Sequence, residues 1–165
     1  MRDWTQEELD ALVDCPKVIV APPRKEPRPE RGSLRNDFEV ASEDGKQRFH
    51  VFIRQSESFA EDFSIGLIYV PSDEPGEIHL FRCNGQHGTL PSGRIGDDPH
   101  FAFHTHLPSA EALAVGSEAW QRVVVTRDYA SFNEALWHFI SITHIGGAEA
   151  VFPRYSQLAL PGASG

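Results

Sequence analysis

An alternation of apolar and polar residues beside an Asp-Gly turn constrains the fold of this chain most strongly. Residues 47–54 place apolar side chains at every second position, at Phe49, Val51 and Ile53. This period of two predicts a strand with one buried face. Asp44-Gly45 precedes it and is typical of a tight hairpin turn, which pairs this strand with another at 37–41. An antiparallel sheet is therefore the expected centre of the protein.

Further strands are expected along the chain, and a nearly continuous apolar run at 63–70 is typical of a central strand. Strands are expected at 17–21, 63–70, 77–83, 99–106 and 122–126. Thr5 and Glu8 form a capping box before a short helix that Pro16 ends, and Ser131 precedes a longer helix over 132–145. The expected fold is α+β: a single antiparallel β-sheet meander with a short N-terminal helix and a C-terminal helix packed on the sheet.

Two segments carry no apolar periodicity. Residues 22–32 are rich in proline and in charges of both signs, which predicts an exposed, extended loop. Residues 147–165 are interpreted as a weakly ordered C-terminal tail, which leaves 1–146 as one globular domain.

Charge and cysteine content narrow the range of partners. The 165 residues carry a formal net charge of −9, which argues against a nucleic-acid partner and suits a basic protein partner better. The two cysteines, Cys15 and Cys83, are too few for a disulfide scaffold. No leader sequence and no long apolar run is visible, so a cytoplasmic protein with no membrane partner is expected. Nothing in the sequence predicts the oligomeric state.

Three histidines fall on one face of the strand expected at 99–106. His100, His104 and His106 alternate with Phe101, Phe103 and Thr105. The aromatic face is expected to join the core, which leaves the histidine face for solvent or a cleft. His50 and His79 lie opposite the main apolar positions of their strands and are interpreted as ordinary histidines.

The segment before this strand is long and contains several glycines. Residues 84–99 show no periodicity, and loops of about 12–15 residues or more are often functional. His87 and Arg94 in this loop, together with His100, are the predicted ligand-binding residues.

The His104-Thr105-His106 run has the spacing of a metal-ligand pair. Side chains two apart on a strand share a face, with Cα atoms about 7 Å apart. Zinc in a catalytic site needs a third protein ligand, for which His100 is the first choice. The other available donors are His87, Asp97, Asp98, Glu111 and Glu118. The same pair could instead act as a metal-free acid and base, or be structural.

The run Phe103 to Ser109 resembles locally the His-x-His-Pro signature of JAB/MPN metallopeptidases, which remove ubiquitin-like modifiers or cut peptides. The resemblance implies a metal held by His104 and His106. That family places an aspartate ligand eleven residues after the second histidine. Here this position is Ser117, with Glu118 next to it, and the proline is displaced by one.

Over the whole chain the sequence resembles an uncharacterised family of small bacterial proteins, defined only as a domain of unknown function. The resemblance lies in the start Trp4 to Asp10, in Glu43 to Phe49, and in His87 followed by Pro99-His100, with a late helix near 136–139. Its members usually have Pro-His-x-His in the strand, whereas this chain has Ala102 at the second histidine position. The resemblance implies a compact bacterial cytoplasmic protein and supplies no activity.

Three functions are consistent with these residues, and the sequence leaves open whether the protein is an enzyme. The first is a binding or regulatory protein with a histidine-lined cleft. The second is a hydrolase that holds a divalent metal such as zinc with His104 and His106 as catalytic candidates. The third is a metal-free phosphodiesterase or ribonuclease that uses the histidine pair.

Overall fold

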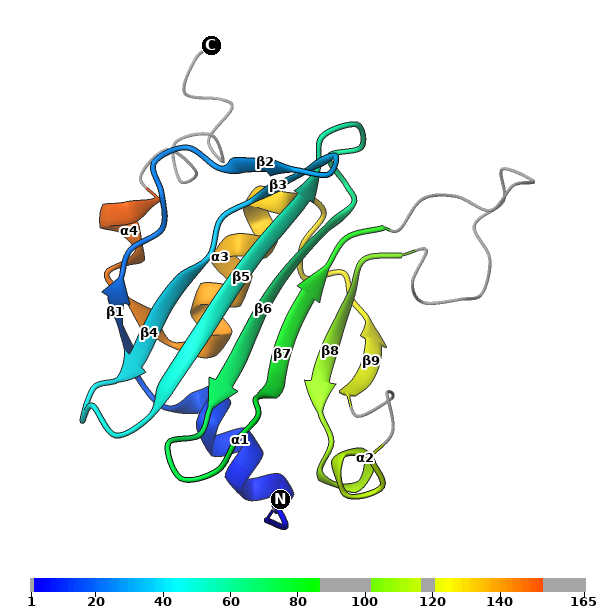
Figure 1. The fold of residues 1–165 in the computed structure, drawn as a ribbon. Coiled ribbons are helices and arrows are strands. Elements are labelled where there is room, and N and C mark those ends of the chain that lie inside the picture. Colours follow the sequence, from blue (N-terminus) through cyan, green and yellow to red (C-terminus); the bar gives the residue numbers. More distant parts are fainter. Residues whose placement is uncertain (1, 87–101, 117–120, 153–165) are drawn as a thin grey trace.

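The computed structural model describes residues 2–86, 102–116 and 121–152 (Figure 1). The helices in this part are α1 (Gln6–Asp14), α2 (Ala110–Ala114), α3 (Phe132–Thr143) and α4 (Ala148–Val151). The strands in the same ranges are β1 (Lys17–Ala21), β2 (Arg28–Glu30), β3 (Ser33–Arg35), β4 (Phe38–Ser42), β5 (Arg48–Ser56), β6 (Phe63–Val70), β7 (Ile78–Asn84), β8 (His104–Pro108), β9 (Gln121–Val125) and β10 (Ile145–Gly146).

All of these strands join one sheet, in the order β10-β1-β4-β5-β6-β7-β8-β9, with β2 and β3 branching from β5. From β4 to β9 the neighbours are antiparallel, as the alternating pattern predicts. The α+β class and the mostly antiparallel sheet are therefore confirmed. The prediction of a simple meander is wrong, because β1 pairs in parallel with β10 and the β2–β3 hairpin adds a branch.

The helices α1 and α3 pack on one face of the sheet and lie behind it in Figure 1. The capping box predicted for α1 is present: the Glu8 amide donates to Thr5 Oγ1 at 3.1 Å, and the Thr5 amide donates to the Glu8 carboxylate at 2.9 Å. The ring of Phe139 in α3 stacks on Phe81 of β7 with centroids 5.9 Å apart. Within the described ranges, no helix combines the length and apolar character needed to cross a membrane.

A buried lysine fixes the edge of the sheet where the parallel pair forms. Lys17 is only 1% exposed, and its ammonium group donates to the carbonyls of Val13, Cys15 and Thr143 at 2.7–2.9 Å. These carbonyls lie at the C-terminal ends of α1 and α3, where a positive charge is favourable. Lys17 therefore joins both helices to β1. In the parallel pair of β1 and β10, Lys17 is the strand partner of Ile145.

The segment 22–32, predicted as an extended loop, contains β2 and the turn that joins it to β3. β2 and β3 pair through a turn at Arg31 and Gly32, both of which have a positive φ. This is the backbone geometry of a two-residue hairpin turn. Arg28 and Arg35 both contact the Glu30 carboxylate, at 3.0 and 3.5 Å, and β3 then pairs with β5. These strands were not predicted because most of their side chains are polar and show no apolar alternation.

The packed core continues beyond residue 146. Ala148 of α4 is 1% exposed and Phe152 is 5% exposed, with its ring 5.7 Å from the ring of Phe38. The rest of the predicted tail, 153–165, lies outside the described residues.

Candidate functional site: the open face of the sheet

The side chains on the sheet face opposite α1 and α3 form rows that cross the strands. The strand pairing aligns Phe52, Gly66, Arg82 and His106 in one row over β5, β6, β7 and β8. The neighbouring row contains Arg54, Ser64, Asn84 and His104. His50 and His79 flank the first row on its other side, opposite Ile68. We call this surface the open face.

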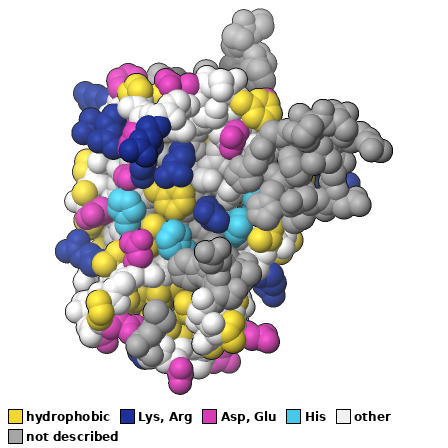
Figure 2. Space-filling view, turned by 45° about the vertical axis from the view of Figure 1, so that its right-hand side comes forward, with side chains coloured by type: hydrophobic (Ala, Val, Ile, Leu, Met, Phe, Trp, Pro, Cys, Tyr) yellow, Lys and Arg dark blue, Asp and Glu magenta, His cyan; other side chains and the backbone are white. Residues whose placement is uncertain are grey.

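Figure 2 shows histidine and basic side chains around a small hydrophobic area on this face of the molecule. The side chains of His50 and His79 keep 33% and 29% of their surface exposed. They lie on the same surface as His106. The sequence interpretation of His50 and His79 as ordinary histidines missed this arrangement, because only the strand register brings them together.

His104 and His106 lie side by side on β8, as the spacing predicts. Their ring centroids are 5.2 Å apart, with planes tilted by 56°. Both are buried, however: His104 has no exposed surface and His106 is 7% exposed. By strand register both histidines belong to the rows of the open face, but their side chains are buried there.

A hydroxyl group behind β7 and β8 holds this part of the sheet in place. Tyr129 Oη lies 2.9 Å from the carbonyl oxygen of Asn84 and 2.7 Å from that of His104, and it accepts from the Asn84 amide at 3.0 Å. Burial raises the pKa of the Tyr129 hydroxyl far above its ordinary value, so it remains a neutral donor. Tyr129 therefore fixes the strand that carries both histidines.

Arg82 is the main charge at the centre of the face. It is half-buried, and its Nη2 lies 3.3 Å from Nδ1 and 3.4 Å from Nε2 of His106. Among the described residues, no carboxylate forms an ion pair with it, and its buried Nε has no acceptor. Burial and then the nearby Arg54 lower the pKa of the Arg82 guanidinium, but the group stays charged at neutral pH.

The other histidines of the face contact carboxylates at its border. His50 Nε2 lies 3.4 Å from the Asp37 carboxylate, and His79 Nε2 lies 3.8 Å from that of Glu77. Burial lowers the pKa of His79, Glu77 raises it and Arg82 lowers it further. The net direction is downward, which favours neutral His79 at physiological pH.

The structure brings together two of the predicted metal ligands. His104 Nδ1 lies 2.8 Å from the Ala102 carbonyl, a contact that orients a metal-binding imidazole in many proteins. Within the described ranges, no three histidine, cysteine, aspartate or glutamate side chains gather as a metal site. Glu111 is exposed on α2. The predicted residues His87, Arg94 and His100 lie outside the described residues, as do the possible donors Asp97, Asp98 and Glu118.

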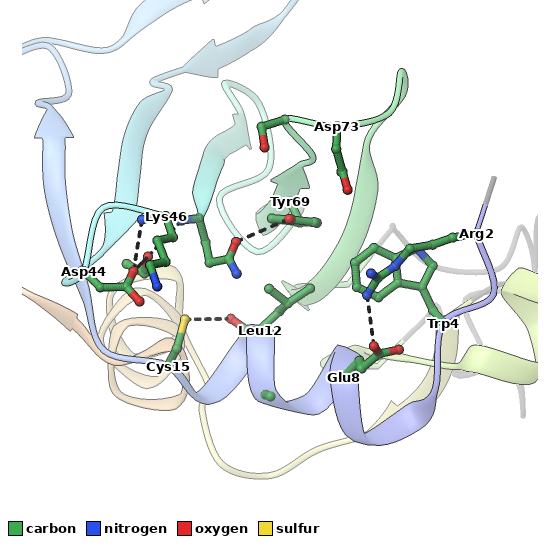
Figure 3. Close-up of a pocket in the computed structure, with 13 residues that line it drawn as sticks. Arg2, Trp4, Glu8, Leu12, Cys15, Asp44, Lys46, Tyr69 and Asp73 are labelled. Carbon is green, nitrogen blue, oxygen red and sulfur yellow. Dashed lines mark hydrogen bonds and ion pairs between the residues drawn. The ribbon is translucent and has the colours of Figure 1, made fainter.

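A cavity of about 570 Å³ lies elsewhere, between α1 and the ends of β4, β5 and β6 (Figure 3). Trp4 and Tyr69 form part of its wall, with rings 5.8 Å apart. Its polar groups interact mainly with one another, as in the 3.0 Å Arg2–Glu8 ion pair. One buried donor, Trp4 Nε1, lacks an acceptor among the described residues.

Comparisons of this chain with protein-family models, with curated proteins and with solved structures find no match.

Proposed function

We propose that the protein is a binding protein for a phosphate-bearing small molecule, which it holds on the open face through Arg82 and His106. The observation that carries this proposal is the half-buried Arg82, whose guanidinium has no carboxylate partner among the described residues. This is the binding protein expected from the sequence, with the ligand site centred on β7 rather than on the histidine strand alone.

The energetics of a partly buried guanidinium support this proposal. Removing a charge from water is costly unless an opposite charge compensates it. Buried charged groups are usually paired, but the neighbours of Arg82 are His106 and a second cation, Arg54. An anion bound between them would relieve this repulsion.

The shape of the group supports phosphate in particular. The planar guanidinium offers parallel N–H donors that match two oxygens of a phosphate or carboxylate. Imidazole side chains such as His106 add a further donor at short range. A basic protein partner, as predicted from the net charge, does not suit this cationic surface and would need another part of the molecule.

Titration with pyrophosphate in a calorimeter tests the proposal directly. Arg82→Gln should weaken binding by about 10- to 100-fold, because hydrogen bonds to charged groups are among the strongest. Arg48→Gln is the matched control: Arg48 is exposed on the same strand face as Phe52, four residues away. Equal losses in both variants, or no saturable binding to the wild-type protein, would overturn the proposal.

A second candidate function is a divalent-metal-dependent hydrolase that uses the His104 and His106 pair. The 5.2 Å ring separation and the contact of His104 Nδ1 with the Ala102 carbonyl support it. Elemental analysis of protein purified without a metal-affinity tag tests it. Stoichiometric zinc that is lost in both His104→Ala and His106→Ala would support this candidate, and metal-free wild-type protein would remove it.

The proposed setting is the bacterial cytoplasm, where phosphorylated metabolites are abundant and thiols stay reduced. The two free cysteines support it: Cys83 is fully buried and Cys15 is partly exposed. We do not propose a metal-free histidine-dependent phosphodiesterase. Without a metal the imidazoles themselves must contact the substrate, and His104 has no exposed surface.

A further inference from the structure

We infer that the phosphate-bearing ligand is a free mononucleotide, whose base stacks on Phe52 while its phosphates contact Arg82. This inference rests on the proposed function and adds the class of ligand.

The ring of Phe52 lies across the backbone of the neighbouring strand. A Cβ atom added to Gly66 would lie only 2.2 and 2.3 Å from Cε1 and Cζ of Phe52. Any side chain at position 66 would therefore lift the ring away. Because Gly66 has none, the Phe52 ring can lie over the backbone of β6.

Phe52 remains partly exposed in this position, although it is apolar. The buried face of β5 consists of Phe49, Val51 and Ile53, so Phe52 is not needed to complete the core beneath the sheet. The hydrophobic area among the charged side chains in Figure 2 shows the mixed chemistry of this surface. A flat aromatic surface beside cations suits the stacking of a planar, phosphorylated ring.

The spacing of the row agrees with one nucleotide. Phe52 and Arg82 are aligned two strands apart, which corresponds to about 10 Å between their backbones. The Phe52 ring already extends over Gly66 toward β7. A base on this ring would therefore place its attached phosphates near the guanidinium.

The neighbours of the ring supply polar contacts for a base and a sugar. The His79 ring centroid lies 6.3 Å from that of Phe52 and is tilted by 55°. Arg54 follows on the same strand face and is exposed. These groups therefore lie beside the Phe52 ring, which stays partly exposed.

Two observations favour a free nucleotide over a nucleic-acid strand. Phe52 is the one phenylalanine, tyrosine or tryptophan on the open face within the described strands β4 to β9, so one base can be stacked there. The surface also becomes more acidic toward β4. Glu39 of β4 is the strand partner of His50, and the Asp37 carboxylate contacts the His50 side chain. With a net charge of −9, the chain is poorly suited to a long polyanion.

Calorimetric titration of the full chain with ADP and with pyrophosphate tests this inference. ADP should bind the wild-type protein about 5- to 100-fold more tightly than pyrophosphate, which is the range expected for stacking one base. Phe52→Leu, which keeps an apolar cover over Gly66, should bring this ratio close to one. Phe52→Tyr should preserve it, and Phe59→Leu, a phenylalanine outside the face, is the matched control.

The possible failures are distinguishable. If pyrophosphate binds through Arg82 but ADP binds no better, or if Phe52→Leu keeps the ratio, the nucleotide inference fails and the proposed function survives. If neither ligand binds, both fail. Tighter binding of hexaadenylate than of ADP would overturn the assignment of a free nucleotide. Thermal unfolding of each variant confirms that a lost ratio is not lost folding.

Discussion

Several polar residues are buried in the fold with defined hydrogen-bond partners. Lys17 is the clearest case, since its ammonium group contacts three carbonyls at two helix ends. Lys17→Met removes all three donors and leaves buried oxygens without hydrogen bonds. We expect the free energy of unfolding to fall by about 2–4 kcal/mol in urea titrations. Lys46→Met, at an exposed position, should change it little.

The two cysteines should differ in reactivity for the same reason. Burial raises the pKa of the Cys83 thiol far above its ordinary value, whereas Cys15 is partly exposed on the wall of the cavity in Figure 3. The thiolate is the reactive form, so native protein should incorporate one equivalent of iodoacetamide, at Cys15. Denatured protein should incorporate two. Rapid native labelling of Cys83 in mass spectra would contradict the packing described for β7.

At the scale of elements, the pairing of β7 with β8 depends on the Tyr129 hydroxyl. Tyr129→Phe removes the donor to the carbonyls of Asn84 and His104. We expect a loss of about 1–3 kcal/mol in the free energy of unfolding. In hydrogen exchange, β8 should lose more protection than β5. Uniform loss across the sheet would argue against a local role.

The Glu8 carboxylate at the N-terminus of α1 should make the stability of the protein depend on pH in the acidic range. The Thr5 backbone hydrogen bond lowers the pKa of Glu8 below its ordinary value of 4.5. A carboxyl whose pKa is lowered in the folded state stabilises the protein above its unfolded pKa, and this contribution is lost as the pH falls through the folded pKa. Glu8→Gln should therefore flatten the decline in thermal stability between pH 5 and strongly acidic pH. The pKa of Asp44 is also lowered in the folded protein. Part of the decline in stability at acidic pH should therefore remain in both the wild-type protein and the Glu8→Gln variant.

The elements themselves were largely predictable from the sequence. The strand at 17–21 matches the structure, and so does the strand at 63–70, which a nearly continuous apolar run predicts. β5 and β7 match within two residues, because one-sided burial imposes a period of two. The β2–β3 hairpin was missed because its side chains are polar and its turn is Arg-Gly. The two-residue β10 is too short to produce any pattern.

The site was only partly predictable. Spacing alone places His104 and His106 together, since both lie on one strand. The row of Phe52, Gly66, Arg82 and His106 depends instead on the register of four strands. A bulge in β7 between the partners of Leu67 and Ile68 shifts that register. Local sequence patterns do not encode such a shift.

At the scale of the whole molecule, the C-terminal part closes the core at the edge opposite β9. The Phe152 ring contacts that of Phe38 and is 5% exposed, although it follows the predicted domain end. Phe152→Ala should therefore lower the free energy of unfolding by about 3–5 kcal/mol, as expected for a large buried side chain. Chemical denaturation measures this directly. A change below 0.5 kcal/mol, typical of an exposed site, would place the domain end before residue 152.

The two faces of the sheet differ. The helices α1 and α3 cover one face, and Arg82 lies in the middle of the other, the open face. The open face is the proposed ligand-binding surface. Backbone amide spectra of the isotopically labelled protein, recorded during titration with ADP, locate the residues that the ligand contacts. The largest shift changes are expected at Phe52, Gly66, Arg82 and His106. Changes confined to Trp4, Leu12 and Tyr69 around the cavity in Figure 3, or no changes at all, would contradict this proposal.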